Sequence, residues 1–199
     1  MSSSALSVAI SIALALCPKS PSAGGATAQA PAADQGTFLT QEEALRLAFP
    51  ECEIERRRVF LSAGQKARVR DLAGTKHESS LAFPYVAKRD GVLVGTAYFD
   101  AHRVRTLRET LMVVVDAEGK ICRIEMLAFA EPREYIPRGN WYGQFIGRGL
   151  DEDLSLKRKI RGVSGASMTA RASVDCARRV LALHQVLAEP AEPTPGNRP

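Results

Sequence analysis

The feature of this sequence that most constrains its fold is a pair of consecutive strand–turn–strand patterns in the middle of the chain. Four mainly apolar segments carry the pattern: residues 85–88, 92–99, 110–115 and 121–129. The first two are separated by an Asp90-Gly91 turn, which is typical of β-hairpins, and the last two by the glycine-containing turn 116–120. Residues 113–115 are apolar throughout, as in a strand inside a sheet. The patterns predict an antiparallel sheet built from hairpins.

Two capping-box patterns predict short helices ahead of this sheet. Thr40 is followed three residues later by Glu43, and Ser62 is followed at the same spacing by Gln65. Each box precedes apolar residues at helical spacing, so we expect one helix to end near the next proline and the other at the next glycine. Residues 59–61 between them indicate a short strand.

Residues 170–188 predict a final amphipathic helix. Apolar side chains recur on one side of this segment, and arginines lie on the other. Strands grouped in the middle of the chain favour an α+β fold over alternating parallel strands and helices. We therefore expect an antiparallel sheet built from hairpins, with helices packed at its ends and a C-terminal closing helix.

The length and composition fit one domain with tails. The chain has 199 residues, of which 45% are hydrophobic, enough to supply a core. We divide it into a leader (residues 1–30), an N-terminal helical and extended part (31–84), a domain core (85–188) and a proline-rich tail (189–199).

The first thirty residues predict export. Residues 5–16 form an apolar run that is too short to span a hydrocarbon core of ~30 Å but suits the centre of a signal peptide. Small residues at Ala26, Ala28 and Ala30 offer cleavage sites. A lipid anchor at Cys17 and an uncleaved leader are the two alternatives.

Charge and composition argue against nucleic acid as a partner. The net charge of +5 comes from 27 basic and 22 acidic residues that are interspersed. The basic triplets 56–58 and 157–159 lack the interleaved aromatic residues that stack on bases, so we interpret them as solvated faces.

Cysteine and histidine spacing predicts no metal site. Without the leader the chain keeps Cys52, Cys122 and Cys176, whose separations match neither zinc nor haem motifs. They are either buried thiols or include one long-range disulfide. The three histidines of the chain are widely spaced.

Residues 131–149 are rich in glycine and aromatic residues. Such loops often line ligand sites, because glycine lets a ligand approach the backbone and flat rings cover flat ligands. Trp141, Tyr142 and Phe145 are the candidates. Trp141 and Phe145 could equally be rings that plug the core.

Residues 160–169 combine three hydroxyl side chains and two glycines directly before the final helix. Free N–H groups and the dipole at a helix start favour a phosphate there. The alternative is ordinary capping, in which Ser167 or Thr169 accepts hydrogen bonds from the first amides of the helix.

The sequence Ser-Gly-Ala-Ser-Met-Thr at residues 164–169 resembles the S/T-G-A-T-x-T signature of the FMN-binding domain. This domain occurs in subunits of sodium-pumping NADH:quinone reductases and Rnf complexes and in related exported flavoproteins. The resemblance covers roughly residues 85–187 and includes the order of parts: hairpins, an aromatic and glycine-rich stretch, then the signature opening a closing helix.

The resemblance implies an FMN site whose phosphate lies at residues 164–167. It implies that Ser167 matches the residue that a flavin transferase, working from FAD, esterifies to the FMN phosphate. The candidate cofactor-binding residues are Ser164, Gly165, Ala166, Ser167, Met168, Thr169, Trp141, Tyr142 and Phe145.

Two residues depart from the family pattern. Ser167 stands where the family usually has threonine, and Arg161 stands where it has an aspartate that the transferase is thought to recognise. Serine can form the same phosphoester. Arg161 could instead pair with the phosphate of a non-covalently bound FMN.

The resemblance implies an exported electron carrier in the periplasm or on the extracytoplasmic face of a membrane. Its partners would be a flavin transferase, if FMN is attached covalently, and membrane or periplasmic redox proteins. The alternatives are a structural or binding domain that has lost the flavin, and a flavin-dependent reductase of a small acceptor.

A second stretch, residues 99–106, places His102, Arg103 and Arg105 between the hairpins. These side chains could contact the phosphate, the flavin ring or an acidic redox partner, or they could belong to a surface loop without a role.

Overall fold

The structure is a computed structural model, and it describes residues 36–189. The predicted leader with its cleavage sites lies outside these residues, as does the predicted tail apart from Glu189.

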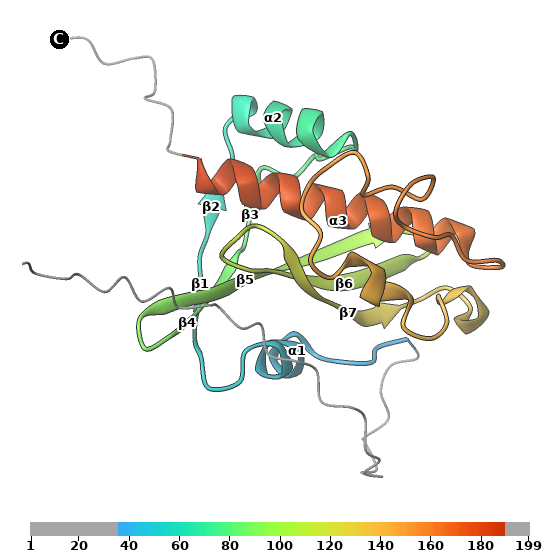
Figure 1. Cartoon of the computed structure of the whole chain (residues 1–199), viewed down its shortest axis with the longest axis horizontal. Coiled ribbons are helices and arrows are strands. Elements are labelled where there is room, and N and C mark those ends of the chain that lie inside the picture. Colours follow the sequence, from blue (N-terminus) through green and yellow to red (C-terminus); the bar gives the residue numbers. More distant parts are fainter. Residues whose placement is uncertain (1–35, 190–199) are drawn as a thin grey trace, which may run out of the picture.

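A five-stranded antiparallel sheet forms the centre of the fold, with the strand order β1-β4-β5-β6-β7 (Figure 1). The strands are β1 (Glu53–Arg56), β4 (Tyr85–Arg89), β5 (Val92–Arg103), β6 (Arg108–Val115) and β7 (Ile121–Phe129). Both predicted hairpins are confirmed, as β4–β5 and β6–β7. The apolar run 113–115 lies in β6, between β5 and β7.

Strand β5 is longer than its apolar pattern predicts. It continues beyond Phe99 to Arg103, which pairs with Arg108 of β6. The carboxylate of Glu131 stabilises the following turn by accepting hydrogen bonds from the amides of Arg105, Thr106 and Leu107, at 3.1, 2.7 and 2.8 Å. His102 and Arg103 therefore lie on a strand rather than in a loop.

Both predicted capping boxes form. The amide of Glu43 donates to Thr40 Oγ1 at 3.2 Å at the start of α1 (Gln41–Ala48). The amide of Gln65 donates to Ser62 Oγ at 3.1 Å at the start of α2 (Ala63–Ala73). Between the two helices lies β2 (Val59–Phe60), which pairs with β3 (Leu81–Ala82) in a separate two-stranded sheet.

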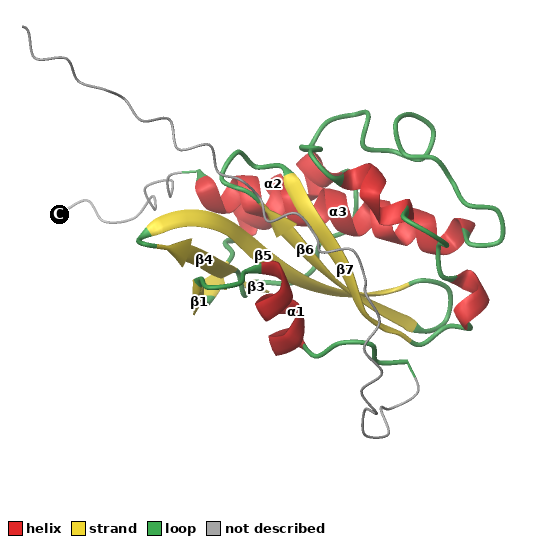
Figure 2. Cartoon of the chain, turned by 60° about the horizontal axis from the view of Figure 1, so that its bottom comes forward, coloured by secondary structure: helices red, strands yellow, loops and turns green. Residues whose placement is uncertain are grey.

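Helices cover both faces of the large sheet (Figures 1 and 2). The long C-terminal helix α3 (Ser167–Ala188) packs on one face against side chains of β5, β6 and β7, and α1 packs on the other. Helix α2 lies against the outer side of α3 and shares a small apolar cluster with it. The predicted α+β fold with a C-terminal closing helix is confirmed.

Between β7 and α3 the chain makes two short 3₁₀ helices, η1 (Arg133–Tyr135) and η2 (Trp141–Phe145), and an irregular segment that leads to α3. Within residues 36–189, none of the helices combines the length and the hydropathy that a membrane crossing would need.

Candidate anion site at the start of helix α3

The signature segment forms the turn into α3 and its first residues. Helix α3 begins at Ser167, three residues earlier than its apolar pattern predicts, so Ser167, Met168 and Thr169 occupy the first turn. Ala166 is the N-cap residue, and no side chain within residues 36–189 caps this end. The amides of the first turn therefore lack a side-chain acceptor, which leaves them available to an anion or to water.

The hydroxyl groups of this segment do not act as caps. Ser167 Oγ donates to the carbonyl of Val163 at 3.2 Å, and Thr169 Oγ1 donates to the carbonyl of Tyr135 at 2.7 Å. The alternative that Ser167 or Thr169 caps the helix is therefore wrong for this structure. Thr169 is buried and anchors the first turn to η1, whereas Ser167 is exposed.

Gly165 shapes the turn that presents these residues. Its φ of +82° lies in the left-handed region that other L-residues rarely adopt. No atom other than those of its chain neighbours lies within 4 Å of the position that a Cβ would take. Ser164, Gly165 and Ser167 are thus exposed on an open turn, while Ala166 is buried beneath it.

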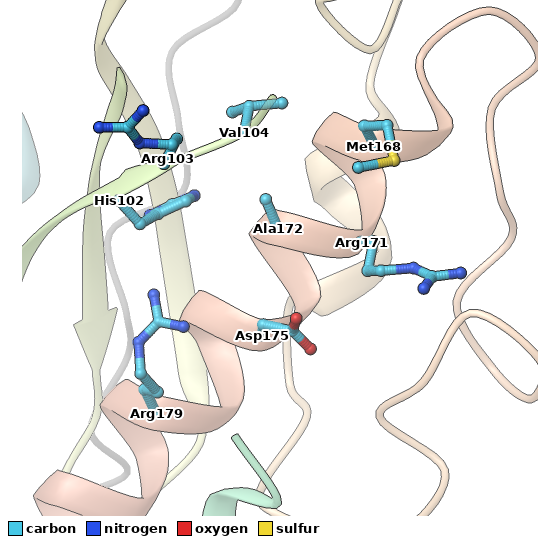
Figure 3. Close-up of a pocket in the computed structure, with 8 residues that line it drawn as sticks. All are labelled: His102, Arg103, Val104, Met168, Arg171, Ala172, Asp175 and Arg179. Carbon is cyan, nitrogen blue, oxygen red and sulfur yellow. The ribbon is translucent and has the colours of Figure 1, made fainter. Parts of the chain in front are cut away.

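A hollow lies beside this turn, between α3 and the end of β5 (Figure 3). It has a volume of about 150 Å³ and is lined by His102, Arg103, Val104, Met168, Arg171, Ala172, Asp175 and Arg179. The fold thus brings the 99–106 stretch next to the signature helix. Because pockets that enclose small molecules are usually ~300–1,000 Å³, a cofactor here would stay partly exposed to solvent.

The hollow carries more positive than negative charge. Arg103 and Arg171 are exposed, and neither forms an ion pair within residues 36–189. Arg161 precedes the turn and is exposed without an ion pair in the same part of the chain. One acid, Asp175, is among the lining residues given above. It is half buried, and burial raises the pKa of its carboxyl group.

A buried ionic network forms the wall of the hollow. Arg179 donates to both carboxylate oxygens of Asp100, at 3.1 and 2.8 Å. The His102 ring bonds Asp100 through Nδ1 at 2.9 Å and Glu109 through Nε2 at 3.2 Å. Figure 3 shows Arg179 extending from α3 toward the strand that carries His102.

This arrangement keeps His102 protonated. Burial would lower the pKa of His102, but hydrogen bonds with Asp100, Cys176 and Glu109 outweigh burial and raise the pKa to about 11. Burial would likewise raise the pKa of Asp100, but its bonds with His102 and Arg179 lower it to about 2. At neutral pH two cations therefore face two carboxylates.

The network continues to the aromatic segment. Tyr142 donates its hydroxyl to Glu109 Oε1 at 2.9 Å and lies 3.2 Å from Ser173 Oγ. Burial, followed by the charge of Glu109, raises the pKa of Tyr142. Its hydroxyl is therefore a neutral structural donor.

Asp100, His102 and Cys176 could also be considered as metal ligands, because their ligand atoms lie within 4.8 Å of one another. Both ring nitrogens of His102 are engaged by carboxylates, and Arg179 binds both oxygens of Asp100. The residues satisfy each other as a hydrogen-bonded cluster, so they do not fit a metal site as they stand.

The structure corrects the prediction that Trp141 and Phe145 contact a flavin ring. Trp141 is 7% exposed and Phe145 is fully buried, both within the core under α3. Trp141 Nε1 donates to the carbonyl of Arg161 at 2.7 Å, and the amide of Arg161 donates to Gln144 Oε1 at 2.9 Å. Segment η2 therefore supports the turn before α3 from inside the fold.

The roles of Asp100, Glu109 and Arg179 were not predicted from the sequence. They are separated in the sequence, and nothing local indicates that they meet. The available signal was that Asp100 directly follows the predicted strand 92–99 and Glu109 directly precedes the predicted strand 110–115. If either strand is longer than predicted, its charged residue is buried, and a buried charge needs a partner.

In comparisons with known proteins, no family model, no curated protein and no solved structure matches this chain.

Proposed function

We propose that this protein is an exported FMN-binding electron carrier that holds the flavin phosphate at the start of α3. The observation that carries the proposal is the placement of the signature-like sequence 164–169. It lies on an exposed turn, at a helix start without a side-chain cap, beside a hollow lined by arginines.

The residues present fit an FMN phosphate. The uncapped amides of the first turn can donate to its oxygens, and Gly165 keeps the approach to the turn open. Arg161, Arg103 and Arg171 have no ion pair within residues 36–189 and supply charge of the right sign. Asp175 would stay at the far side of the hollow from the signature turn, two helical turns along α3.

Covalent attachment is chemically open to Ser167. Its exposed Oγ would attack the flavin-side phosphorus of FAD, forming one P–O bond while the bond to the AMP phosphate breaks, and its proton would be lost. A transferase would supply the geometry. The hydrogen bond from Ser167 to Val163 holds the hydroxyl at the turn, where a second protein can reach it.

The shallow hollow favours a carrier over a stand-alone catalyst. Bound FMN would supply one- and two-electron chemistry. Because the hollow of about 150 Å³ cannot enclose a ring system, the flavin would present an edge to a redox partner. The proposed partners are membrane or periplasmic redox proteins, and the proposed site of action is outside the cytoplasm.

The test is the intact mass and visible spectrum of the protein after co-expression with a flavin transferase. We expect a yellow protein heavier by one FMN less one water, and a Ser167→Ala variant without that mass. Ser80→Ala is the matched control, because it removes an exposed hydroxyl outside the signature segment and should keep the adduct.

Three other results would change the assignment. A yellow protein of unmodified mass would indicate non-covalent FMN. A colourless protein that also fails to bind added FMN would overturn the proposal in favour of a structural domain that has lost the flavin. Turnover of a small acceptor without a protein partner would favour a reductase.

A further inference from the structure

A second, larger cleft opens on the other side of the buried ionic network. Strand β4 pairs with β5 only as far as Tyr85 opposite Ala97, whereas β5 continues along β6 to Arg103. Beyond Ala97, β5 therefore lacks a neighbour on the β4 side, and a cleft of about 790 Å³ lies there. This volume is within the ~300–1,000 Å³ range of small-molecule sites.

Aromatic rings form part of the cleft wall. Tyr85 and Phe99 pack edge to face with ring centroids 5.2 Å apart, and Phe83 lies on the same wall. All three are partly rather than fully buried, unlike Phe145 in the core. Partly exposed rings inside a cleft offer flat apolar surface to a flat ligand.

The charged groups around these rings are mainly positive. Arg56, Lys76 and Arg103 are exposed cleft residues, and none forms an ion pair within residues 36–189. Of the two acids that line the cleft, Asp100 is already neutralised by Arg179 and His102, which leaves Glu78. Arg56 lies over the ring of Phe83, at 4.2 Å from its centroid, so positive charge and flat surface coincide.

One residue that lines the cleft has a buried polar atom without a partner. His77 lines the cleft, and its Nε2 is buried and has no hydrogen-bond partner within residues 36–189. Burial and the charge of Arg179 lower the pKa of His77, so the ring is neutral near pH 7. A buried polar group without a partner within the fold is typical of a place where a ligand or a water completes the bonding.

We propose that this cleft binds a flat organic anion, such as an aromatic carboxylate, separately from the flavin. The ring would lie against Phe83 and Phe99, and the carboxylate would pair with Arg56, Lys76 or Arg103. The site does not depend on the signature turn. Because His102, Arg103 and Arg179 line both cavities, the anion would lie directly across the ionic network from Met168.

The experiment is calorimetric titration of flavin-free, full-length protein with 2-naphthoate. Two analogues separate the contributions: 2-naphthalenemethanol keeps the flat ring without the charge, and cyclohexanecarboxylate keeps the charge without the flat ring. We expect saturable binding of one 2-naphthoate, and at least fivefold weaker binding of either analogue.

Two variants locate the site. Lys76→Gln with Arg56→Gln removes two exposed charges that line only the cleft, and should weaken binding of 2-naphthoate about tenfold. Arg171→Gln removes one exposed charge that lines only the hollow, and should leave binding unchanged within twofold. Circular dichroism checks that each variant is folded.

Absence of saturable binding to the wild-type protein would overturn the proposal. Equal affinity for the neutral analogue would also overturn it. So would a loss of 2-naphthoate binding in Arg171→Gln that does not occur in the cleft variant. Since the titration uses protein without flavin, it is independent of whether Ser167 carries FMN.

Discussion

The aromatic segment η2 and the signature turn contribute to the fold in opposite ways, although the sequence linked both to the same flavin. Phe145 and Trp141 lie in the core under α3, while Ser164, Ser167 and Met168 are exposed at its start. The two regions meet at one residue. The backbone of Arg161 bonds the side chains of Trp141 and Gln144.

The difference shows that glycine and aromatic residues mark tight packing as readily as they mark a ligand surface. In η2, Trp141, Tyr142 and Phe145 pack against one another with ring centroids 5.1 to 6.3 Å apart. Because Trp141 and Phe145 are buried within this cluster, their rings are not accessible to a flavin as the protein is folded here. The aromatic segment therefore holds the turn in place, and the proposed binding groups lie on the turn.

The largest expected effect is on the aromatic side of the comparison. Phe145→Ala should destabilise the protein by about 3–5 kcal/mol, because it leaves a cavity in the core. Met168→Ala removes a side chain that is 51% exposed, and should change stability by less than about 0.5 kcal/mol. Urea unfolding measures both. If the two variants lose similar free energies of unfolding, the view that Phe145 lies in the core and Met168 on the surface is wrong.

The second prediction concerns the ionic network that joins the two regions. His102→Gln should cost about 3 kcal/mol at pH 6, because it leaves Asp100 and Glu109 buried without their shared cation. Since the pKa of His102 is raised from 6.5 to about 11 on folding, its contribution is complete below pH 6.5 and is lost as the pH rises toward 11.

Urea unfolding at pH 6 and pH 9.5 checks this sign. The difference between wild type and His102→Gln should shrink at the higher pH. His184→Gln is the matched control, because burial lowers the pKa of His184 and its contribution is therefore lost on the acid side instead. A difference that is the same at both pH values would mean that His102 is neutral in the folded protein.

The third prediction tests whether η2 supports the signature turn. Trp141→Phe keeps a ring in the core but removes the donor to the carbonyl of Arg161, and should cost about 1.5 kcal/mol. Hydrogen exchange should become faster in residues 161–166. Gln144→Met removes the acceptor for the Arg161 amide and should have the same local effect. If hydrogen exchange in residues 161–166 is unchanged in both variants, η2 does not support the signature turn.

The sheet and the helices could be predicted because their signals are local. Asp90-Gly91 sets a hairpin, and the capping boxes at Thr40 and Ser62 set two helix starts. Strand β1 was missed, because it is an edge strand with mainly exposed side chains and no apolar alternation. The pairing of β1 with β4 is a tertiary contact that the sequence of β1 does not indicate.

The candidate site was predictable only in part. The turn before α3 is contiguous, so six residues were enough to propose it as a candidate site. The ionic network joins Asp100, Glu109 and Arg179 from three elements, and only the packing of α3 on β5 and β6 brings them together. The sequence alone could not show whether Trp141 is buried in the core or contacts a ligand, because either role suits a flat apolar ring at this position.

The smallest expected effect on stability comes from the residue at which the two regions meet. Arg161→Asp replaces an exposed side chain without an ion pair in the described part of the chain, so stability should change by less than about 0.5 kcal/mol. The backbone bonds of residue 161 to Trp141 and Gln144 do not need the arginine side chain and should persist. The variant introduces an aspartate where the FMN-binding domain that residues 164–169 resemble usually has one, while Ser167 and the turn stay as they are.

If a flavin transferase recognises that aspartate, the fraction of protein carrying covalent FMN should rise in Arg161→Asp, as measured by intact mass. If Arg161 instead binds the phosphate of non-covalent FMN, the variant should bind added FMN more weakly than wild type, because a carboxylate near the phosphate repels it. Arg138→Asp introduces the same charge change at an exposed arginine elsewhere on the 131–149 segment and should do neither. A variant that matches wild type in both measurements would show that residue 161 affects neither route, and that the departure from the family pattern at this position has no consequence for flavin binding.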